Sequence, residues 1–186
     1  MNRYAMMLKK LTADSNTPYM QSVVVFNEGK IAHSGGFTDK SYQMLRQAIT
    51  LAKKGTTPKK YEDIYYYYIT LIKMMQEDHR DGLATIGELE QIVKSSQSAK
   101  GSPFSASDPR WQADIDIHKT IFLLRAGREQ EAEACYGNFL KTKDPFSYDY
   151  LHAVEYLTEA CRWNDIISLW DRIRPNIIDL GQEPYY

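Results

Sequence analysis

Acidic, histidine and cysteine side chains are the residues of this 186-residue chain whose spacing could support catalysis or metal binding. Asp114-x-Asp116-x-His118 comes closest to a metal site, because Asp114 and His118 are four residues apart and share one face of a helix. A zinc site takes at least three protein ligands, so this pair is too small. We therefore interpret Asp114 and His118 as a surface ion pair, and we expect no metal and no cofactor. Only a pocket that gathers both residues and Asp116 around an ion would favour an enzyme.

The remaining chemical candidates lack the neighbours that their chemistry needs. His79-Arg80-Asp81 has the letters of a kinase catalytic-loop triplet, but the sequence has no glycine-rich loop, strand lysine or Asp-Phe-Gly triplet to accompany it. Cys135 has no activating base beside it, which favours a buried structural thiol. Glu129, Glu131 and Glu133 lie two apart and point away from one another on a helix. The sequence therefore predicts a protein that is not an enzyme.

The run Tyr65-Tyr66-Tyr67-Tyr68 is the strongest candidate for a binding surface. Four consecutive residues point to all sides of a helix. We expect Tyr65 and Tyr68 in the core, and Tyr66 and Tyr67 partly exposed or covered by a neighbouring segment. Tyrosine is favoured at protein interfaces and can also stack on unpaired bases. The alternative is that the whole run belongs to the structural core.

Positive charge is concentrated in the first third of the chain. Residues 1–60 contain ten Lys or Arg and three Asp or Glu, whereas residues 61–108 and 109–186 are both net acidic. A basic segment favours an acidic protein partner or nucleic-acid phosphates, although a chance excess of solvated lysines explains it equally well. The predicted partner-binding residues are Tyr66, Tyr67, Lys9, Lys10, Lys53, Lys54, Lys59 and Lys60.

Helical periodicity covers most of the sequence. It predicts helices at about residues 3–12, 39–54, 59–78, 109–127, 128–142, 145–160 and 163–174, and another from the Asp81-Gly82 turn to about residue 96. Predicted starts are at Thr38, Asp108 and Asp144-Pro145, and predicted ends are at Gly55, Gly127 and Pro175. Residues 19–33 favour a helix, although Val23-Val24-Val25 followed by Asn27-Glu28-Gly29-Lys30 would also suit a hairpin. Residues 95–109 are rich in Ser, Gly and Pro and predict a loop or linker.

Cysteine usage and hydropathy indicate the compartment. Cys135 and Cys161 both fall within helix patterns and form no disulfide framework, so a reducing, intracellular compartment fits best. No apolar run approaches the ~18 residues that a membrane span needs. Residues 1–13 contain three basic residues and no acid, which suits either a weak mitochondrial presequence or, as we favour, a first helix. We expect the cytoplasm or the mitochondrial matrix.

A segment recurs at a fixed spacing in the C-terminal half. Gly127–Tyr136 and Cys161–Trp170 are 34 positions apart, and each predicts a turn followed by an amphipathic helix. This period is the length of one helix–turn–helix repeat. The turn at Gly82 lies 45 residues before Gly127, about one period once the linker is subtracted. Such repeats build binding surfaces and seldom carry reaction chemistry.

The residues at these turns resemble the tetratricopeptide repeat, most clearly over residues 109–175. In that family a glycine makes the turn, a small residue lets the two helices approach, and an aromatic follows one turn later. The matching positions are Gly127, Ala132 and Tyr136, then Cys161, Trp163, Ile166 and Trp170 in the next unit. The resemblance implies an all-α fold of three to four stacked antiparallel helix hairpins, an α-solenoid.

A second resemblance is to the pentatricopeptide repeat, carried by Ser147–Leu151 and Asp171–Arg174. In that family the residue after the tyrosine helps to read an RNA base, and here that residue is Asp149. An acidic side chain in a net acidic segment opposes phosphate binding, so this half is not expected to read RNA directly. The interpretation that remains from this resemblance is a degenerate pentatricopeptide-like unit that binds protein inside an organellar ribonucleoprotein.

These observations predict four segments and one function class. Residues 1–97 form an N-terminal helical region, 98–108 a linker, 109–175 two repeat-like helix pairs and 176–186 an extended tail. The predicted function is a non-catalytic interaction scaffold or a subunit of a larger complex. The alternative is an RNA-associated organellar subunit, similar to a mitochondrial ribosomal one, whose basic N-terminal segment contacts RNA.

Overall fold

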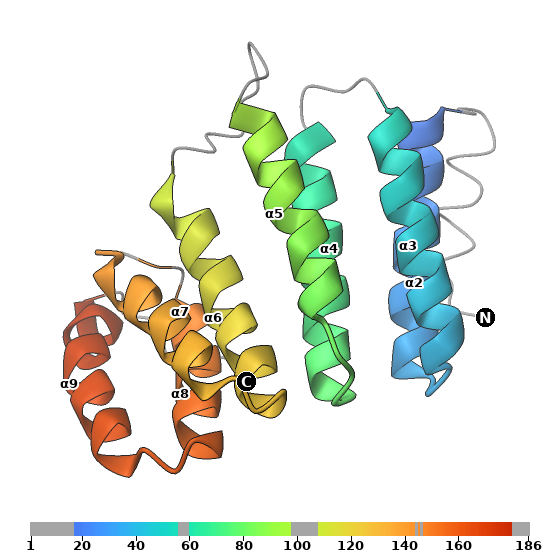
Figure 1. Cartoon of the computed structure of the whole chain (residues 1–186). Helices are drawn as coiled ribbons and strands as arrows, with labels where there is room; N and C mark the ends of the chain where they lie inside the picture. Colours follow the sequence, from blue (N-terminus) through green and yellow to red (C-terminus); the bar gives the residue numbers. More distant parts are fainter. Residues whose placement is uncertain (1–16, 56–59, 98–107, 144, 146, 180–186) are drawn as a thin grey trace. The chain divides into compact units, whose positions relative to one another are not determined.

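The computed structural model describes residues 17–55, 60–97, 108–143, 145 and 147–179, and every regular element in these ranges is an α-helix. The all-α class is therefore confirmed. The described helices are α2 (Pro18–Ser34), α3 (Thr38–Lys54), α4 (Lys60–Glu77), α5 (Leu83–Gln97), α6 (Pro109–Arg125), α7 (Glu129–Lys141), α8 (Asp149–Glu159) and α9 (Trp163–Asp179) (Figure 1). None of them is both long enough and apolar enough to cross a bilayer.

The chain divides into two compact units, Met1–Ser107 (unit 1) and Asp108–Tyr186 (unit 2). The described residues of each unit form two helical hairpins whose consecutive helices pack together. In unit 1 the hairpins α2–α3 and α4–α5 meet through α3 and α4, whereas in unit 2 the hairpins α6–α7 and α8–α9 meet through α6 and α8. The two units therefore join their hairpins through different helices.

Residues 19–33 form a helix rather than the alternative hairpin. The side chain of Thr17 accepts a hydrogen bond from the Met20 amide at 3.4 Å, and Pro18 occupies the first turn, where its missing N–H has no cost. Gly29 then allows α2 to approach α3 closely, since a Cβ at this position would lie 3.3 Å from the side chains of Met44 and Leu45. The local cap and this close approach together favour a helix over a strand pair.

The core of unit 1 comes from the predicted apolar stripes. Ile64, Tyr68 and Leu71 of α4 are fully buried, and so are Ile86 and Leu89 of α5. One predicted boundary differs by a single residue. The cap of α3 is Phe37, with no side-chain hydrogen bond, and Thr38 is the first helical residue. The predicted end at Gly55 is confirmed. Pro58, the predicted start of α4, lies outside the described residues.

All four hairpins of the described chain close with the same turn. One residue in each turn has a left-handed backbone conformation: Gly36, His79, Gly127 and Cys161. The next amide donates to the carbonyl five residues earlier, as from Arg128 to Leu123 at 2.9 Å and from Arg162 to Leu157 at 2.8 Å. This is the Schellman arrangement, which satisfies the last helical carbonyls. The two C-terminal turns are thus the same structure 34 residues apart, whereas the α4–α5 turn is centred on His79 and not on Gly82.

Helix α6 is the most deeply buried helix of unit 2, and it begins as predicted. Asp108 caps it by accepting the Arg110 amide at 3.0 Å, and Pro109 follows. Ile115, Ile117 and Ile121 are fully buried. Such a helix needs neighbours on several sides. Within unit 2 it packs against both α7 and α8.

Two predicted boundaries in unit 2 are wrong. Helix α8 begins at Asp149 rather than at Pro145, which is buried before the helix starts. Helix α9 continues through Pro175 to Asp179, so the predicted extended tail is helical over residues 176–179. A proline has a helix-compatible φ and removes a single N–H···O bond, so it weakens a helix without having to end it. The other positions of the predicted tail, and most of the predicted linker, lie outside the described residues.

Candidate interaction surface

The tyrosine run separates into one exposed and three buried side chains. Tyr65 and Tyr68 are buried as predicted, and Tyr66 is 53% exposed. Tyr67 is covered by Phe26, whose ring stacks on it at a centroid distance of 4.2 Å, and its hydroxyl lies 3.4 Å from Ser22 Oγ. This burial raises the pKa of Tyr67. Tyr67 is therefore covered by a neighbouring segment, one of the two expected alternatives, and its side chain links α2 to α4 in the core.

Lys53 is exposed, but its side chain contacts Tyr68 of α4. Its Nζ donates to the Tyr68 hydroxyl at 2.9 Å and lies 5.2 Å from the centroid of that ring. The Tyr68 hydroxyl in turn donates to Glu88 at 2.8 Å, and burial together with Glu88 raises the pKa of Tyr68. Of the other predicted lysines, Lys54 is exposed and Lys60 is half-buried. Lys9, Lys10 and Lys59 lie outside the described residues.

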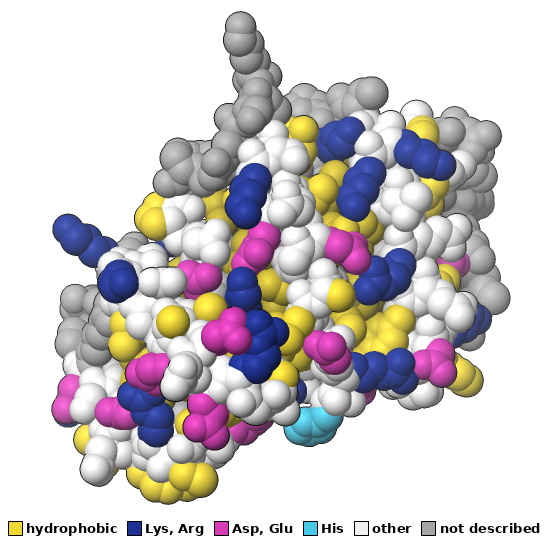
Figure 2. Space-filling model, viewed as in Figure 1, with side chains coloured by type: hydrophobic (Ala, Val, Ile, Leu, Met, Phe, Trp, Pro, Cys, Tyr) yellow, Lys and Arg dark blue, Asp and Glu magenta, His cyan; other side chains and the backbone are white. Residues whose placement is uncertain are grey.

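Part of the positive charge in the first third of the chain is compensated by acidic residues in the described part of unit 1. Described residues 17–55 carry five Lys or Arg and two acids, and residues 60–97 carry four and seven. Arg46 meets Glu88 at 3.4 Å, and Arg80 meets Asp39 at 2.8 Å. Figure 2 shows basic and acidic side chains interleaved over this unit. The basic first hairpin therefore has its acidic complement in the second.

The pair Asp114 and His118 is buried, so its interpretation as a surface ion pair is wrong. Both side chains are fully buried, with His118 Nε2 3.4 Å from Asp114 Oδ1. From α8, the Tyr148 hydroxyl donates to Asp114 at 3.3 Å, and the His152 ring lies 4.3 Å from that of His118. Burial and the charge of Asp114 raise the pKa of Tyr148. These contacts make a polar network that joins α6 to α8.

This polar network does not form a metal centre. Asp116, the third residue of the predicted cluster, accepts a hydrogen bond from Gln112 Nε2 at 2.9 Å. Among the described residues, no group of three or more His, Cys, Asp or Glu side chains is placed to hold a metal ion. These contacts hold α6 against α8, because buried charged groups need polar partners inside the fold.

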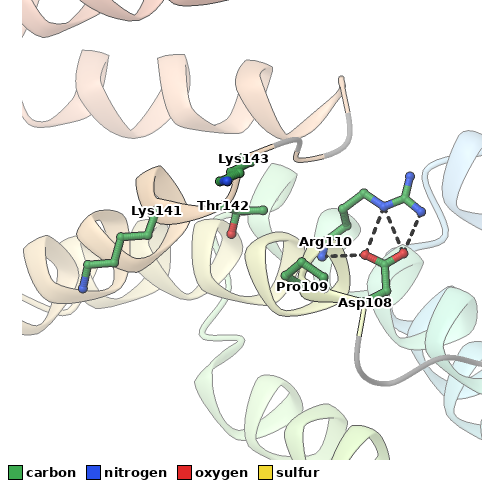
Figure 3. Close-up of a pocket in the computed structure, with 6 residues that line it drawn as sticks. All are labelled: Asp108, Pro109, Arg110, Lys141, Thr142 and Lys143. Atoms are coloured by element: carbon green, nitrogen blue, oxygen red, sulfur yellow. Dashed lines mark hydrogen bonds and ion pairs between the residues drawn. The ribbon is translucent and has the colours of Figure 1, made fainter.

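An open pocket of about 480 Å³ lies in unit 2 where α6 begins and α7 ends. Its lining residues are Asp108, Pro109, Arg110, Lys141, Thr142 and Lys143 (Figure 3). The Arg110 guanidinium donates hydrogen bonds to both oxygens of the Asp108 carboxylate at 2.6 to 3.0 Å. These bonds lower the pKa of the Asp108 carboxyl. Figure 3 shows the Lys141 side chain pointing away from this pair. The polar groups of the pocket therefore do not converge on a common point.

The most exposed apolar surface of unit 2 lies along α9. Trp163, Ile167 and Trp170 are 59%, 63% and 54% exposed. Their spacing of four and three residues places them in one row on the helix. We call this row the α9 face. Leu169 and Ile173, on the adjacent side, are buried. Figure 2 shows hydrophobic side chains gathered at the end of unit 2 where α8 turns into α9.

The equivalent face of α7, 34 residues earlier, is covered. Trp170 corresponds to Tyr136, which is only 3% exposed because the Tyr156 ring lies 4.9 Å away and the Arg162 guanidinium 5.5 Å above it. Ile167 corresponds to Glu133, which accepts hydrogen bonds from Tyr156 at 3.0 Å and from Arg162. Both covering residues belong to the α8–α9 hairpin. The α9 face is thus the counterpart of a face that a following hairpin covers in α7.

Sequence reasoning did not single out the α9 face as a binding surface. Trp163 and Trp170 were matched to aromatic positions of a repeat, and such positions are expected to pack internally. The spacing of these two residues and Ile167 predicts an apolar row on one side of the helix. Periodicity alone does not show whether such a row is covered.

A scan against protein-family models, a search of curated proteins and a search of solved structures each found no match to this chain.

Proposed function

We propose that this protein is a non-catalytic subunit or scaffold that binds another protein chain through the α9 face. The observation that carries the proposal is the row of Trp163, Ile167 and Trp170, each more than half exposed. Tryptophan in particular is enriched among the residues that dominate interface energies. A contiguous exposed row of this kind marks an interaction surface more often than scattered single apolar residues do.

The position of the row supports a helical partner. In α7 the equivalent positions contact Tyr156 and Arg162 of the next hairpin. A surface of this form accepts a helix or a helical hairpin, which is the contact that tetratricopeptide-like stacking repeats from unit to unit. We propose such stacking for unit 2, supported by the identical turns at Gly127 and Cys161.

RNA binding is the less favoured alternative. Its basis was the positive charge of residues 1–60, and residues 61–107, with four basic and seven acidic side chains, reduce that excess from seven to four over unit 1. Lys53, Arg46 and Arg80 also make polar contacts inside unit 1. Phosphate binding would have to use other basic residues, and it would weaken steeply as salt is raised.

The proposal is tested by affinity purification of the full chain followed by quantitative mass spectrometry. The double variant Trp163→Ala/Trp170→Ala should lose, by tenfold or more, the proteins that accompany the wild-type chain. The matched control is Tyr66→Ala, which removes an aromatic ring of similar exposure from unit 1. Loss with Tyr66→Ala but not with the double variant would contradict the proposal and return the binding site to the tyrosine run.

A further inference from the structure

We propose that the partner is a helical hairpin of a different protein and that it binds α8 as well as the α9 face. This inference rests on the proposed function, and it adds a second helix to the binding surface and names the class of partner. It uses the 34-residue spacing of unit 2, in which the turns at Gly127 and Cys161 have the same hydrogen bonds. Each exposed position of the α8–α9 hairpin can therefore be compared with its counterpart in the α6–α7 hairpin.

The exposed apolar surface of unit 2 continues from α9 onto α8. Leu151 of α8 is 59% exposed, whereas Ile117, its counterpart 34 residues earlier in α6, is fully buried. Trp170 and Tyr136 show the same contrast, since they are 54% and 3% exposed. Both helices of the α8–α9 hairpin therefore expose a large apolar side chain at a position that is covered in the α6–α7 hairpin.

Packing inside unit 2 shows what kind of segment covers such positions. Helix α8 packs against α6, and the ring of its Tyr156 lies 4.9 Å from that of Tyr136 in α7. The turn after α8 then brings the Arg162 guanidinium over the Tyr136 ring. One helix and the turn that follows it thus contact both helices of the preceding hairpin. The matching occupant of the α8–α9 surface is a helical hairpin whose first helix lies along α8 and whose turn lies over Trp170.

The chemistry of the α9 face disfavours another copy of the α8–α9 hairpin in this position. On α7, Glu133 accepts hydrogen bonds from Tyr156 at 3.0 Å and from Arg162. The counterpart of Glu133 in α9 is Ile167, whose side chain has no acceptor. A stacked copy would therefore bring a hydroxyl and a guanidinium against an apolar side chain, and burying such donors without acceptors is costly. The surface instead fits a hairpin that presents apolar side chains over Ile167.

The size of this two-helix surface sets the expected strength of binding. Its apolar part measures roughly 500 Å², contributed by the exposed areas of Leu151, Trp163, Ile167 and Trp170. A polar rim surrounds the apolar centre of most interfaces, and a standard interface buries about 800 Å² per partner in total. The apolar centre found here suits a complex at the lower end of that range. We therefore expect a dissociation constant of about 1–100 µM.

Site-specific photo-crosslinking of the full chain tests the inference. The photoreactive amino acid p-benzoylphenylalanine replaces Leu151, Ile167 or Ser168, one position at a time, in cells that make the protein. Ser168 is the matched control, because it is exposed and lies about 100° around α9 from Ile167. After irradiation, Leu151 and Ile167 should each cross-link to the same partner protein, at sites within one of its helical hairpins. Ser168 should not cross-link to that protein.

Substitution of the same positions measures their contribution to binding. Leu151→Lys should weaken binding of the cross-linked protein about fivefold or more, because it places a charge in the apolar centre of the interface. Ser168→Lys adds the same charge outside the surface and should leave binding unchanged. Far-UV circular dichroism checks that both variants are folded, as expected for substitutions of exposed residues.

The inference and the proposed function fail through different outcomes. Cross-links from Ile167 without any from Leu151 would confine binding to the α9 face and overturn the inference, while the proposed function stands. Cross-links that map only to a second copy of this chain, or to a partner segment outside a helical hairpin, would also overturn the inference alone. If neither Leu151 nor Ile167 cross-links to a protein, both proposals are rejected.

Discussion

Helices α7 and α9 hold equivalent positions in two hairpins of one unit, yet their outer faces differ in kind. Their inner faces match, since Phe139 of α7 and Ile173 of α9 are both buried. On the outer face, α7 combines the Tyr136 ring with Glu133, which accepts hydrogen bonds from the next hairpin, whereas the α9 face consists of two tryptophans and an isoleucine. An exposed apolar row of this kind is typical of a helix face that takes part in an interaction, so the two helices differ in how their outer faces are covered.

The largest effect should come from removing the covered ring of α7. Tyr136→Ala should lower the free energy of unfolding of unit 2 by about 3–5 kcal/mol, because the ring is almost fully buried against Phe139 and Tyr156 and the deletion leaves a cavity. Urea unfolding followed by tryptophan fluorescence measures it, since all three tryptophans lie in unit 2. A loss below about 1 kcal/mol would mean that the α8–α9 hairpin does not cover α7 as described.

Alkaline pH should lower the stability of unit 2, because the Tyr136 hydroxyl on the covered face of α7 is buried. Burial raises the pKa of Tyr136 to about 12, from an unfolded value near 10. Its contribution to stability is therefore fully present below about pH 10 and is lost as pH rises through about 12. The decline should reach at most about 2.7 kcal/mol from this residue, since each pKa unit corresponds to about 1.4 kcal/mol. Tyr136→Phe keeps the ring and removes the ionisable group, so it should lose less stability than the wild type between about pH 10 and 12 in parallel urea titrations. Equal losses would show that the hydroxyl is not buried.

The sequence predicts the helices and turns in this comparison, but it does not predict which helix faces are covered. The reason for this difference is physical. The helices and the 34-residue spacing follow from apolar periodicity and turn residues, which are local signals. The cover over Tyr136 comes from Tyr156 and Arg162, which lie 20 or more residues away, and local patterns carry no information on such contacts. The buried pair Asp114 and His118 was misinterpreted for the same reason, because its environment is supplied by α8.

Capping residues also predicted helix starts correctly at one position and wrongly at another. Asp108-Pro109 starts a helix as predicted, whereas Asp144-Pro145 does not, although the two dipeptides are identical. A proline at the first helical position permits a helix without requiring one. In the tyrosine run, helix geometry assigned Tyr65 and Tyr68 to the core, but only the position of Phe26 decides that Tyr67 is covered and Tyr66 is not.

The two equivalent turns should respond in opposite directions to substitution. Gly127 has a φ of +72°, and a Cβ added there would meet nothing within 4 Å, so Gly127→Ala should cost about 1 kcal/mol through backbone strain alone. Cys161 already bears a side chain at a φ of +56°, so Cys161→Gly should stabilise unit 2 by relieving that strain, by up to about 1 kcal/mol. Urea midpoints at constant m-value measure both. Two losses of similar size would show that the turns are not equivalent.

The smallest effect should come from the exposed ring of α9. Trp170→Ala should change the free energy of unfolding by no more than about 0.5 kcal/mol, because an exposed side chain has few contacts to lose. Circular dichroism is the suitable readout, since the substitution removes a fluorophore. A loss of about 3 kcal/mol would place Trp170 in the core of its own chain. A near-neutral effect at Trp170, beside the large loss expected at Tyr136, is what separates an exposed face from a covered one.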